Sequence, residues 1–217
     1  MVKPQATGIL AARSKCETEC VESESGQLRA SVREAYSRAA AHPNERHPFP
    51  MGKEFALSLG YPRELLAKIP YTSIEGFAGV SNVSVFAAPP AGGTVVDLGC
   101  GSGLDSLIAA QRAGGEGRIV GIDFSDSMLE RANSSLREIG WHNVLFLQSA
   151  AEQLPLASAS VDQALVNGIF NLNLLRDEIF MELARIMKPG GSVFGAELVL
   201  EAPLPEAFRA GEANWFS

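Results

Sequence analysis

The chain has 217 residues, a formal net charge of −7 and an apolar fraction of 46%, which is ordinary for a globular protein. This length suits one α/β domain with an additional segment, and it allows a sizeable core. The negative charge, without any cluster of Lys and Arg, argues against a nucleic-acid partner, because phosphate binding needs a basic surface. No apolar run reaches the roughly 18–20 residues that span a bilayer, so we expect no membrane partner.

The cysteine pattern bears on metal binding and on the cellular compartment. Three cysteines, one of them inside a glycine-rich segment, do not form a disulfide framework. Cys16 and Cys20 have no further Cys or His at ligand spacing, so we interpret them as exposed thiols. The N-terminal residues 1–20 lack the apolar core of a signal peptide. We therefore expect a cytoplasmic protein without a metal site.

Two segments precede the predicted core. Residues 1–25 are polar and mixed in charge, and we expect a disordered tail there. Residues 26–90 are predicted to form a helical cap or lid, because apolar residues recur at helical spacing from Leu28 to Ala39 and a short helix begins at Pro62. Residues 71–90 are too irregular in Gly, Ser and Pro for an assignment.

Strand and helix patterns alternate over the predicted core, residues 91–217. We expect strands at 94–98, 118–122, 143–147, 161–166 and 192–200, and helices at 104–113, 126–139 and 174–187, the last stopped by Pro189-Gly190-Gly191. This alternation predicts a doubly wound, mainly parallel α/β sheet with right-handed crossovers. We expect further C-terminal strands to be missing, because only residues 201–217 follow the fifth strand, and an exposed sheet edge invites pairing with a second copy of the chain as a homodimer.

A glycine-rich motif joins the first strand to the next helix. It reads Val95-Val96-Asp97-Leu98-Gly99-Cys100-Gly101-Ser102-Gly103, and the second strand ends in Asp123, 20 residues later (123 − 103). Glycines let the backbone approach a ligand, a helix start offers free N–H groups, and the second acid accepts hydrogen bonds from ribose hydroxyls. The layout predicts a nucleotide-cofactor site in a βαβ unit.

The glycine spacing distinguishes between cofactors. Dinucleotide enzymes use G-x-G-x-x-G, whereas this chain has G-x-G-x-G followed by Leu104. The segment from Asp97 to Gly103 resembles motif I of the class I S-adenosylmethionine-dependent methyltransferases, which have a Rossmann-like core. This resemblance implies S-adenosylmethionine as the cofactor, with the glycine loop along its methionine part.

From about Leu59 to Leu200 the chain is similar to the arsenite methyltransferase branch of that family. The matching segments are Leu59-Gly60-Tyr61, Gly103-Leu104-Asp105, Gly121-Ile122-Asp123-Phe124, Asn167-Gly168-Ile169-Phe170-Asn171-Leu172 and Ile186-Met187-Lys188-Pro189-Gly190-Gly191. The arsenic-binding cysteines of the branch are absent, since Gly79 and Gly168 stand at two aligned positions and no cysteine follows the fifth strand. As(III) needs thiolate ligands, so we expect a rebuilt acceptor site.

The expected cofactor-binding residues begin with the motif itself. Asp97 should fix the glycine loop by accepting hydrogen bonds from its backbone N–H groups. Gly99, Cys100 and Gly101 should contact the methionine part through their backbone, with Cys100 serving as a small side chain rather than a nucleophile. Asp123 should bind the ribose, because an acid that ends the second strand faces it.

Further cofactor contacts follow from the resemblance. Phe124 and Met128 are expected to flank the adenine, although Met128 also fits a helical core stripe. Adenine recognition should rest on the backbone near Ala151, and Glu152 is either a surface acid or a partner of a contacting residue. Asn167 is expected on the floor between cofactor and acceptor.

Three side chains have two interpretations each. Tyr36 resembles the tyrosine that caps the methionine end of the cofactor, but it is equally a helix-face aromatic of the core. Asp105 is either a cofactor contact or a helix-terminus acid that the helix dipole favours. Glu197 is a candidate base or a surface-facing strand end, so the catalytic residues stay unassigned.

These features favour a methyltransferase that acts on a small, partly apolar acceptor, because residues 43–86 are rich in Phe and poor in charge. The alternative is a non-catalytic cofactor-binding module or a subunit that needs a partner. A nicotinamide oxidoreductase is disfavoured by the glycine spacing and by Leu104.

Overall fold

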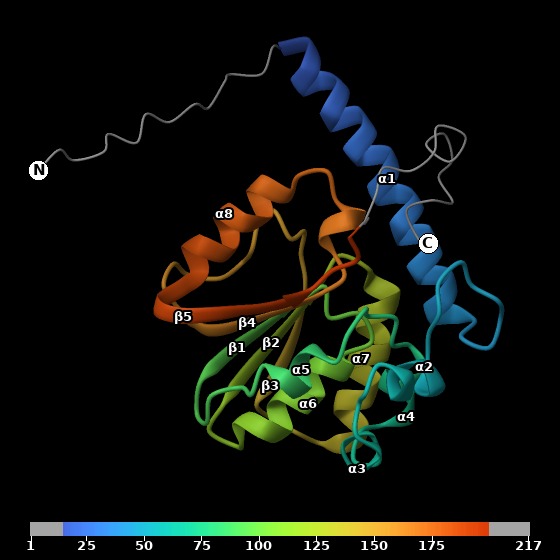
Figure 1. Cartoon of the computed structure of the whole chain (residues 1–217), viewed down its shortest axis with the longest axis vertical. Helices are drawn as coiled ribbons and strands as arrows, with labels where there is room; N and C mark the ends of the chain where they lie inside the picture. The colour runs from blue at the N-terminus through green and yellow to red at the C-terminus, as the bar shows by residue number, and fades with distance from the viewer. Residues whose placement is uncertain (1–14, 200–217) are drawn as a thin grey trace, which may run out of the picture.

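The computed structural model describes residues 15–199, with side chains from residue 26 onward. Five parallel strands form one sheet in the order β3-β2-β1-β4-β5 (Figure 1): β1 (Thr94–Leu98), β2 (Arg118–Asp123), β3 (Val144–Gln148), β4 (Val161–Asn167) and β5 (Met187–Ala196). The strand order reverses between β1 and β4, and ligands of such sheets bind at the carboxyl ends beside this point. The predicted doubly wound parallel fold is confirmed.

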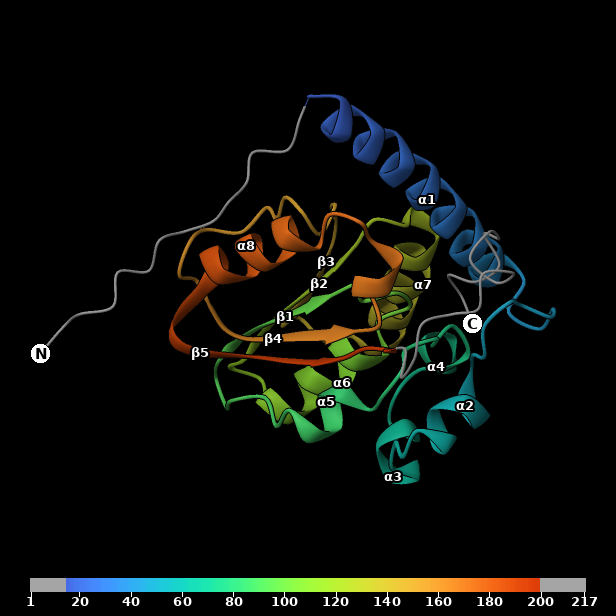
Figure 2. The same cartoon turned by 45° about the horizontal axis from the view of Figure 1, so that its top comes forward.

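Helices cover both faces of the sheet. One face carries α5 (Val83–Phe86), α6 (Leu104–Ala113) and α7 (Asp126–Ile139), and the other carries α8 (Arg176–Ile186), which follows the short 3-10 helix η1 (Phe170–Leu172) (Figure 1). The long helix α1 (Lys15–Ala41) packs on α7 beyond the carboxyl ends of the strands (Figure 2). The covering segment is completed by α2 (Lys53–Ser58), α3 (Arg63–Leu66) and α4 (Tyr71–Glu75).

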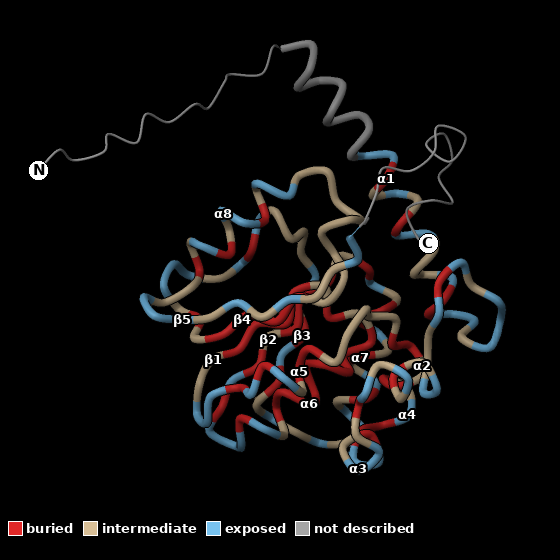
Figure 3. The backbone as a smooth tube through the Cα atoms, viewed as in Figure 1, coloured by how far each residue is buried: buried red, intermediate tan, exposed pale blue. Residues whose placement is uncertain are grey.

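The apolar side chains of β1 alternate between two cores. Val95 packs with Leu107 and Leu129 on the side of α6 and α7, whereas Val96 and Leu98 pack on the side of α8. Successive strand residues point to opposite faces, and both faces are covered, so this strand is apolar almost throughout. Figure 3 shows the buried residues concentrated in the sheet and in the helices packed against it. The same alternation directs the side chain of Asp97 toward α6.

The structure corrects the end of the last predicted helix. We expected Pro189-Gly190-Gly191 to stop a helix and a strand to follow at 192, but α8 ends at Ile186 and β5 begins at Met187. Met187 already pairs with Val161 of β4, and regular pairing resumes at Ser192. The Pro-Gly-Gly segment therefore forms an irregularity inside the strand, where proline and a glycine with φ of 82° are tolerated.

The N-terminal third also differs from the prediction. We expected disorder over residues 1–25, but α1 begins at Lys15, because the Glu-rich and Lys-containing sequence continues the helix beyond the apolar positions. Residues 1–14 lie outside the described residues, as do the side chains of Cys16 and Cys20. The segment 71–90, left unassigned from sequence, contains α4 and α5. Within residues 15–199 no helix combines the length and apolar character that a membrane span requires.

Gly121 of β2 allows a close approach between the sheet and α6. A Cβ at this position would lie 2.5 Å from Cδ1 of Phe146 and 2.9 Å from Oγ of Ser106. Both neighbours are buried, so neither side chain is free to move into solvent.

We predict that Gly121→Ala lowers the free energy of unfolding by about 1–3 kcal/mol, the usual cost of overpacking a core. Urea denaturation measures this. The control is Gly115→Ala, where an added Cβ would meet no heavy atom within 4 Å. Equal stabilities of the two variants would contradict the packing argument.

Candidate active site

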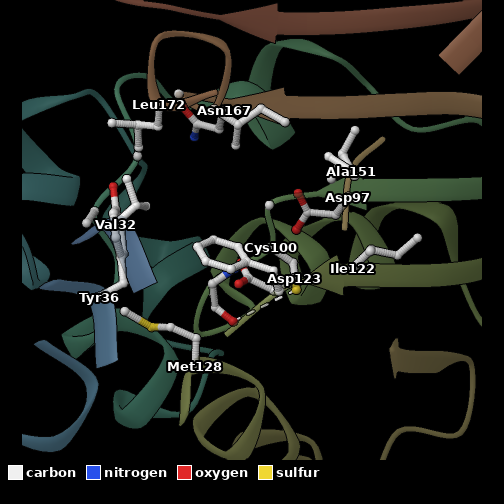
Figure 4. Close-up of a pocket in the computed structure, with 18 of the residues that line it drawn as sticks. Val32, Tyr36, Asp97, Cys100, Ile122, Asp123, Met128, Ala151, Asn167 and Leu172 are labelled. Carbon is white, nitrogen blue, oxygen red and sulfur yellow. Dashed lines mark hydrogen bonds between the residues drawn. The ribbon is translucent and has the colours of Figure 1, made fainter. Parts of the chain in front are cut away.

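One pocket collects the predicted site residues at the carboxyl ends of β1, β2 and β4. It encloses about 1120 Å³ of empty space, including its opening to solvent. Its lining includes every residue that the sequence singled out for cofactor binding: Tyr36, Asp97, Gly99, Cys100, Gly101, Asp123, Phe124, Met128, Ala151, Glu152 and Asn167. In Figure 4, Asp97, Cys100 and Asp123 lie on one side of this pocket, and Val32 and Tyr36 of α1 lie on the other.

The glycine loop is held by β2. The backbone N–H groups of Gly99 and Cys100 both donate to the carbonyl of Ile122, at 2.8 and 3.0 Å, and that of Gly101 donates to Oδ2 of Asp123 at 2.8 Å. Gly99 has φ of 76°, and a Cβ there would collide with Ile169. This position therefore requires glycine for both its backbone conformation and its close contact.

Our prediction that Asp97 holds the glycine loop is wrong. Its Oδ2 accepts the hydroxyl of Ser106 in α6 at 2.5 Å, because the strand alternation points this side chain at α6. The loop is instead tied to Asp123. Asp123 in β2 thus accepts the hydrogen bond from the loop that we expected Asp97 in β1 to accept.

Asp123 connects the loop to the start of α7. Besides Gly101, it accepts the backbone N–H of Ser125, at 2.8 Å to Oδ1. A carboxylate has about four lone-pair sites, so each oxygen keeps acceptor capacity for a ligand in the pocket. The geometry is therefore compatible with the predicted ribose contact and adds a structural role.

Three buried carboxyl groups, those of Asp97, Asp105 and Asp123, lie at the pocket. Burial raises the pKa of Asp97 to about 8, and repulsion from Asp105 contributes. Burial also raises the pKa values of Asp105 and Asp123, opposed by the hydrogen bonds that each accepts. Unpaired buried carboxylates favour a proton or a bound cation. Among the described residues no group of three His, Cys, Asp or Glu side chains is arranged to hold a metal ion.

Asn167 uses its whole amide inside the protein. Its Oδ1 accepts the N–H groups of Val80 and Ser81, at 2.9 and 3.1 Å, and its Nδ2 donates to the carbonyl of Ser81 at 2.7 Å and to Oδ2 of Asp105 at 2.8 Å. The residue lines the pocket, and its amide fixes the loop at Val80 and Ser81 over the end of β4.

Asp105 belongs to the same network. Its Oδ1 accepts the hydroxyl of Tyr61 at 2.6 Å, together with the hydroxyl and the N–H of Ser84. Both Tyr61 and Ser84 come from the segment that covers the core. Asp105 therefore joins this segment to α6, which the sequence did not reveal because the partners lie 44 and 21 positions away.

Helix α1 forms one wall of the pocket, and Tyr36 is the residue of this wall that the sequence predicted. Leu28, Arg29 and Val32 also line the pocket, one and two turns before Tyr36. Nη2 of Arg29 lies 2.5 Å from Oε1 of Glu152, which also accepts a hydrogen bond from Asn173. Glu152 is thus an interior link between α1 and the segment after η1. The helical periodicity of α1 was the available signal, but it does not say what the helix packs against.

The remaining predicted contacts have mixed surroundings. Met128 is buried in an apolar cluster with Ala39, Ala40 and Phe49, and it also lines the pocket, so it contributes to both the core and the pocket wall. The guanidinium of Arg33 lies 5.4 Å from the centre of the Phe124 ring.

The thiol of Cys100 is buried. Burial, followed by the nearby Asp123, raises the pKa of this thiol well above its ordinary value. A protonated thiol is a poor nucleophile, in agreement with its expected role as a small side chain.

Comparison with known proteins identifies the family of this chain. Residues 90–216 match the family model of a methyltransferase domain. The chain belongs to this family. Its sheet and glycine loop are those of the class I S-adenosylmethionine-dependent methyltransferases, and S-adenosylmethionine is the cofactor that the family assigns to it.

Individual relatives agree on the fold but differ in their acceptors. An arsenite methyltransferase from Halobacterium salinarum is 33% identical over 148 residues, covering 68% of this chain and 38% of the relative. A demethylmenaquinone methyltransferase from Desulfitobacterium hafniense is 35% identical over 128 residues, covering 58% and 49%. This chain thus spans less than half the length of either curated relative.

Two solved structures of methyltransferases share the fold of this chain. The crystal structure of an arsenic(III) S-adenosylmethionine methyltransferase from Chlamydomonas reinhardtii has a TM-score of 0.56 and 28% sequence identity, covering 76% of this chain and 56% of that one. A phosphoethanolamine N-methyltransferase from Haemonchus contortus shares the fold at 23% identity and a TM-score of 0.53.

The buried acid Asp97 predicts that the stability of the protein depends on pH. Because its folded-state pKa is raised, the native protein binds a proton that the unfolded chain has released between about pH 4 and 8. The free energy of unfolding should therefore fall as the pH rises across this window. In Asp97→Asn this fall should shrink by at least about 1.4 kcal/mol, the equivalent of one pKa unit. Urea denaturation at pH 5 and pH 8 without cofactor tests this, and an unchanged pH dependence would contradict it.

The Asn167 network predicts a large effect of one amide. Asn167→Ala leaves the N–H groups of Val80 and Ser81 without their acceptor and should lower the free energy of unfolding by roughly 1–3 kcal/mol or more. Asn133→Ala is the matched control, because its amide donates only to the Leu129 carbonyl one helical turn away. Chemical denaturation of both variants should show the larger loss for Asn167→Ala.

Proposed function

We propose that this chain transfers a methyl group from S-adenosylmethionine to a small-molecule acceptor. The observation that carries the proposal is the pocket itself, which joins the glycine loop, Asp123 and two further buried carboxyl groups at the carboxyl ends of adjacent strands. Family membership supports the cofactor, and the small acceptor is our own inference from the lining of the pocket region.

The residues present fit the cofactor in charge and in shape. S-adenosylmethionine carries a sulfonium and an ammonium group, and a cationic ligand would favour the ionised form of the buried carboxyl groups of Asp97, Asp105 and Asp123, whose pKa values burial raises. The backbone of the glycine loop leaves space for the methionine part. Asp123 would accept hydrogen bonds from the ribose hydroxyls.

Other residues would complete the cofactor site. Tyr36 would cover the methionine end, and Phe124, Met128 and Ala151 would surround the adenine. Glu152 would act indirectly, by holding Arg29 of α1 across the opening. We assign residues 26–90 as the cap of this site and residues 91–217 as the cofactor-binding core, which also carries the sheet edge at β5 for a possible second copy of the chain.

The chemistry requires mainly positioning. When bound, the cofactor supplies a methyl group already activated on sulfur, so the displacement needs little covalent help from the protein. The chain's own residues orient both molecules and exclude water through α1 and the cap. Glu197, the candidate base, accepts the N–H groups of Phe170 and Asn171, at 2.6 and 3.3 Å to Oε2. It therefore serves to position η1.

Arsenite methylation through thiolates is not supported. Gly79 and Gly168 occupy the positions where the related branch has cysteines, and the thiols of this chain are Cys16, Cys20 and Cys100. A Cβ at Gly79 would lie 2.5 Å from Nδ2 of Asn167. A cysteine there would displace the amide that fixes the covering loop.

The ribose role of Asp123 is tested by binding. Asp123→Ala should weaken the binding of S-adenosylhomocysteine at least tenfold, or about 1.4 kcal/mol, as measured by calorimetry. Asp126→Ala is the control, since this acid is exposed in the first turn of α7, three positions after Asp123, and does not line the pocket. Tighter binding of NAD than of S-adenosylhomocysteine by the unaltered protein would contradict the proposed function.

A further inference from the structure

A second cavity adjoins the cofactor pocket, and its chemistry is different. It encloses about 760 Å³ of empty space, including its opening. Five residues line both cavities: Tyr36, Ala78, Gly79, Gly168 and Leu172. The two cavities therefore adjoin along these residues, and the second lies next to Tyr36, where we assign the methionine end of the first.

The second cavity has an apolar lining. Phe55, Leu59, Val80 and Leu198 contribute to its wall, and none of its described lining residues is charged. This contrasts with the three buried acids of the neighbouring pocket. Transfer of a charged group into such surroundings without a partner costs several kcal/mol, so the lining selects against ions.

Polar groups in this wall are few, and one lacks a partner. Tyr36 and Asn171 are the residues of the lining with hydrogen-bonding side chains. The Oδ1 atom of Asn171 is buried and has no hydrogen-bond partner among the described residues. Such an atom carries a desolvation cost that a ligand with one N–H or O–H donor would remove.

We propose that this apolar cavity binds the methyl acceptor, and that the acceptor is an uncharged, largely apolar compound with a hydrogen-bond donor for Oδ1 of Asn171. The inference rests on the proposed function, and it names the substrate class of the same site. Gly79 and Gly168 lie where the two cavities adjoin and add no side chain there, at the positions where the related branch carries thiols.

The test uses two fluorescent probes with the same ring skeleton and the same N–H group. N-phenyl-1-naphthylamine is uncharged, and 8-anilinonaphthalene-1-sulfonate adds one sulfonate. We expect the full chain, saturated with S-adenosylhomocysteine, to bind the uncharged probe at least tenfold more tightly. Equal or tighter binding of the sulfonated probe would overturn the proposal.

A matched pair of variants locates the probe. Leu198 lines the cavity and is 57% exposed, so its replacement leaves the core intact. Leu198→Glu should weaken the uncharged probe at least tenfold, while Leu198→Gln, of the same size without the charge, should weaken it clearly less. Equal effects of the two variants, or no effect of either, would exclude the apolar cavity as the binding place.

Calorimetry with S-adenosylhomocysteine separates the two claims. Both Leu198 variants should retain the affinity of the unaltered protein for this ligand, since Leu198 does not line the first pocket. If S-adenosylhomocysteine binds but the uncharged probe does not, the acceptor inference alone is wrong. If S-adenosylhomocysteine itself fails to bind, the proposed function is lost and the inference with it.

Discussion

The amide of Asn167 forms four hydrogen bonds, and the shape of both cavities depends on them. Three go to the loop at Val80 and Ser81, and the fourth goes to Asp105 at the start of α6. This one side chain therefore fixes the covering segment relative to the carboxyl ends of the strands. Because Asp105 also binds Tyr61 and Ser84, a change at any member of this network alters the junction between the cofactor and acceptor spaces.

The two cavities differ in polarity. Buried carboxyl groups line the first, and burial raises their pKa values. The second is apolar and shares Tyr36 with the first. Burial, Asp123 and Glu197 raise the pKa of the Tyr36 hydroxyl, so this group stays protonated between the two spaces. This difference in polarity is the basis on which we propose a charged cofactor for the first cavity and an uncharged acceptor for the second.

The sequence predicts β1 and β2 well because each is a short apolar run bounded by glycine or acid, and local pattern suffices for that. It predicts the pocket residues for the same reason, since the ends of parallel strands meet at one edge. It does not predict contacts between distant segments: Arg29 pairs with Glu152 across 123 positions, and no local signal marks either side chain. The wrong role for Asp97 arose because a strand-end acid can face either the loop or the adjacent helix, and Ser106 decides in favour of the helix.

The buried thiol of Cys100 has a consequence for chemical durability. Peroxides oxidise thiolates, and the fraction of thiolate falls as the pKa rises. Burial and the neighbouring acids raise that pKa, and the sulfur atom contacts the carbonyl of Gly101. The raised pKa therefore lowers the fraction of thiolate at Cys100, and with it the rate of oxidation, at a place where a bulkier oxidised sulfur would enter the pocket.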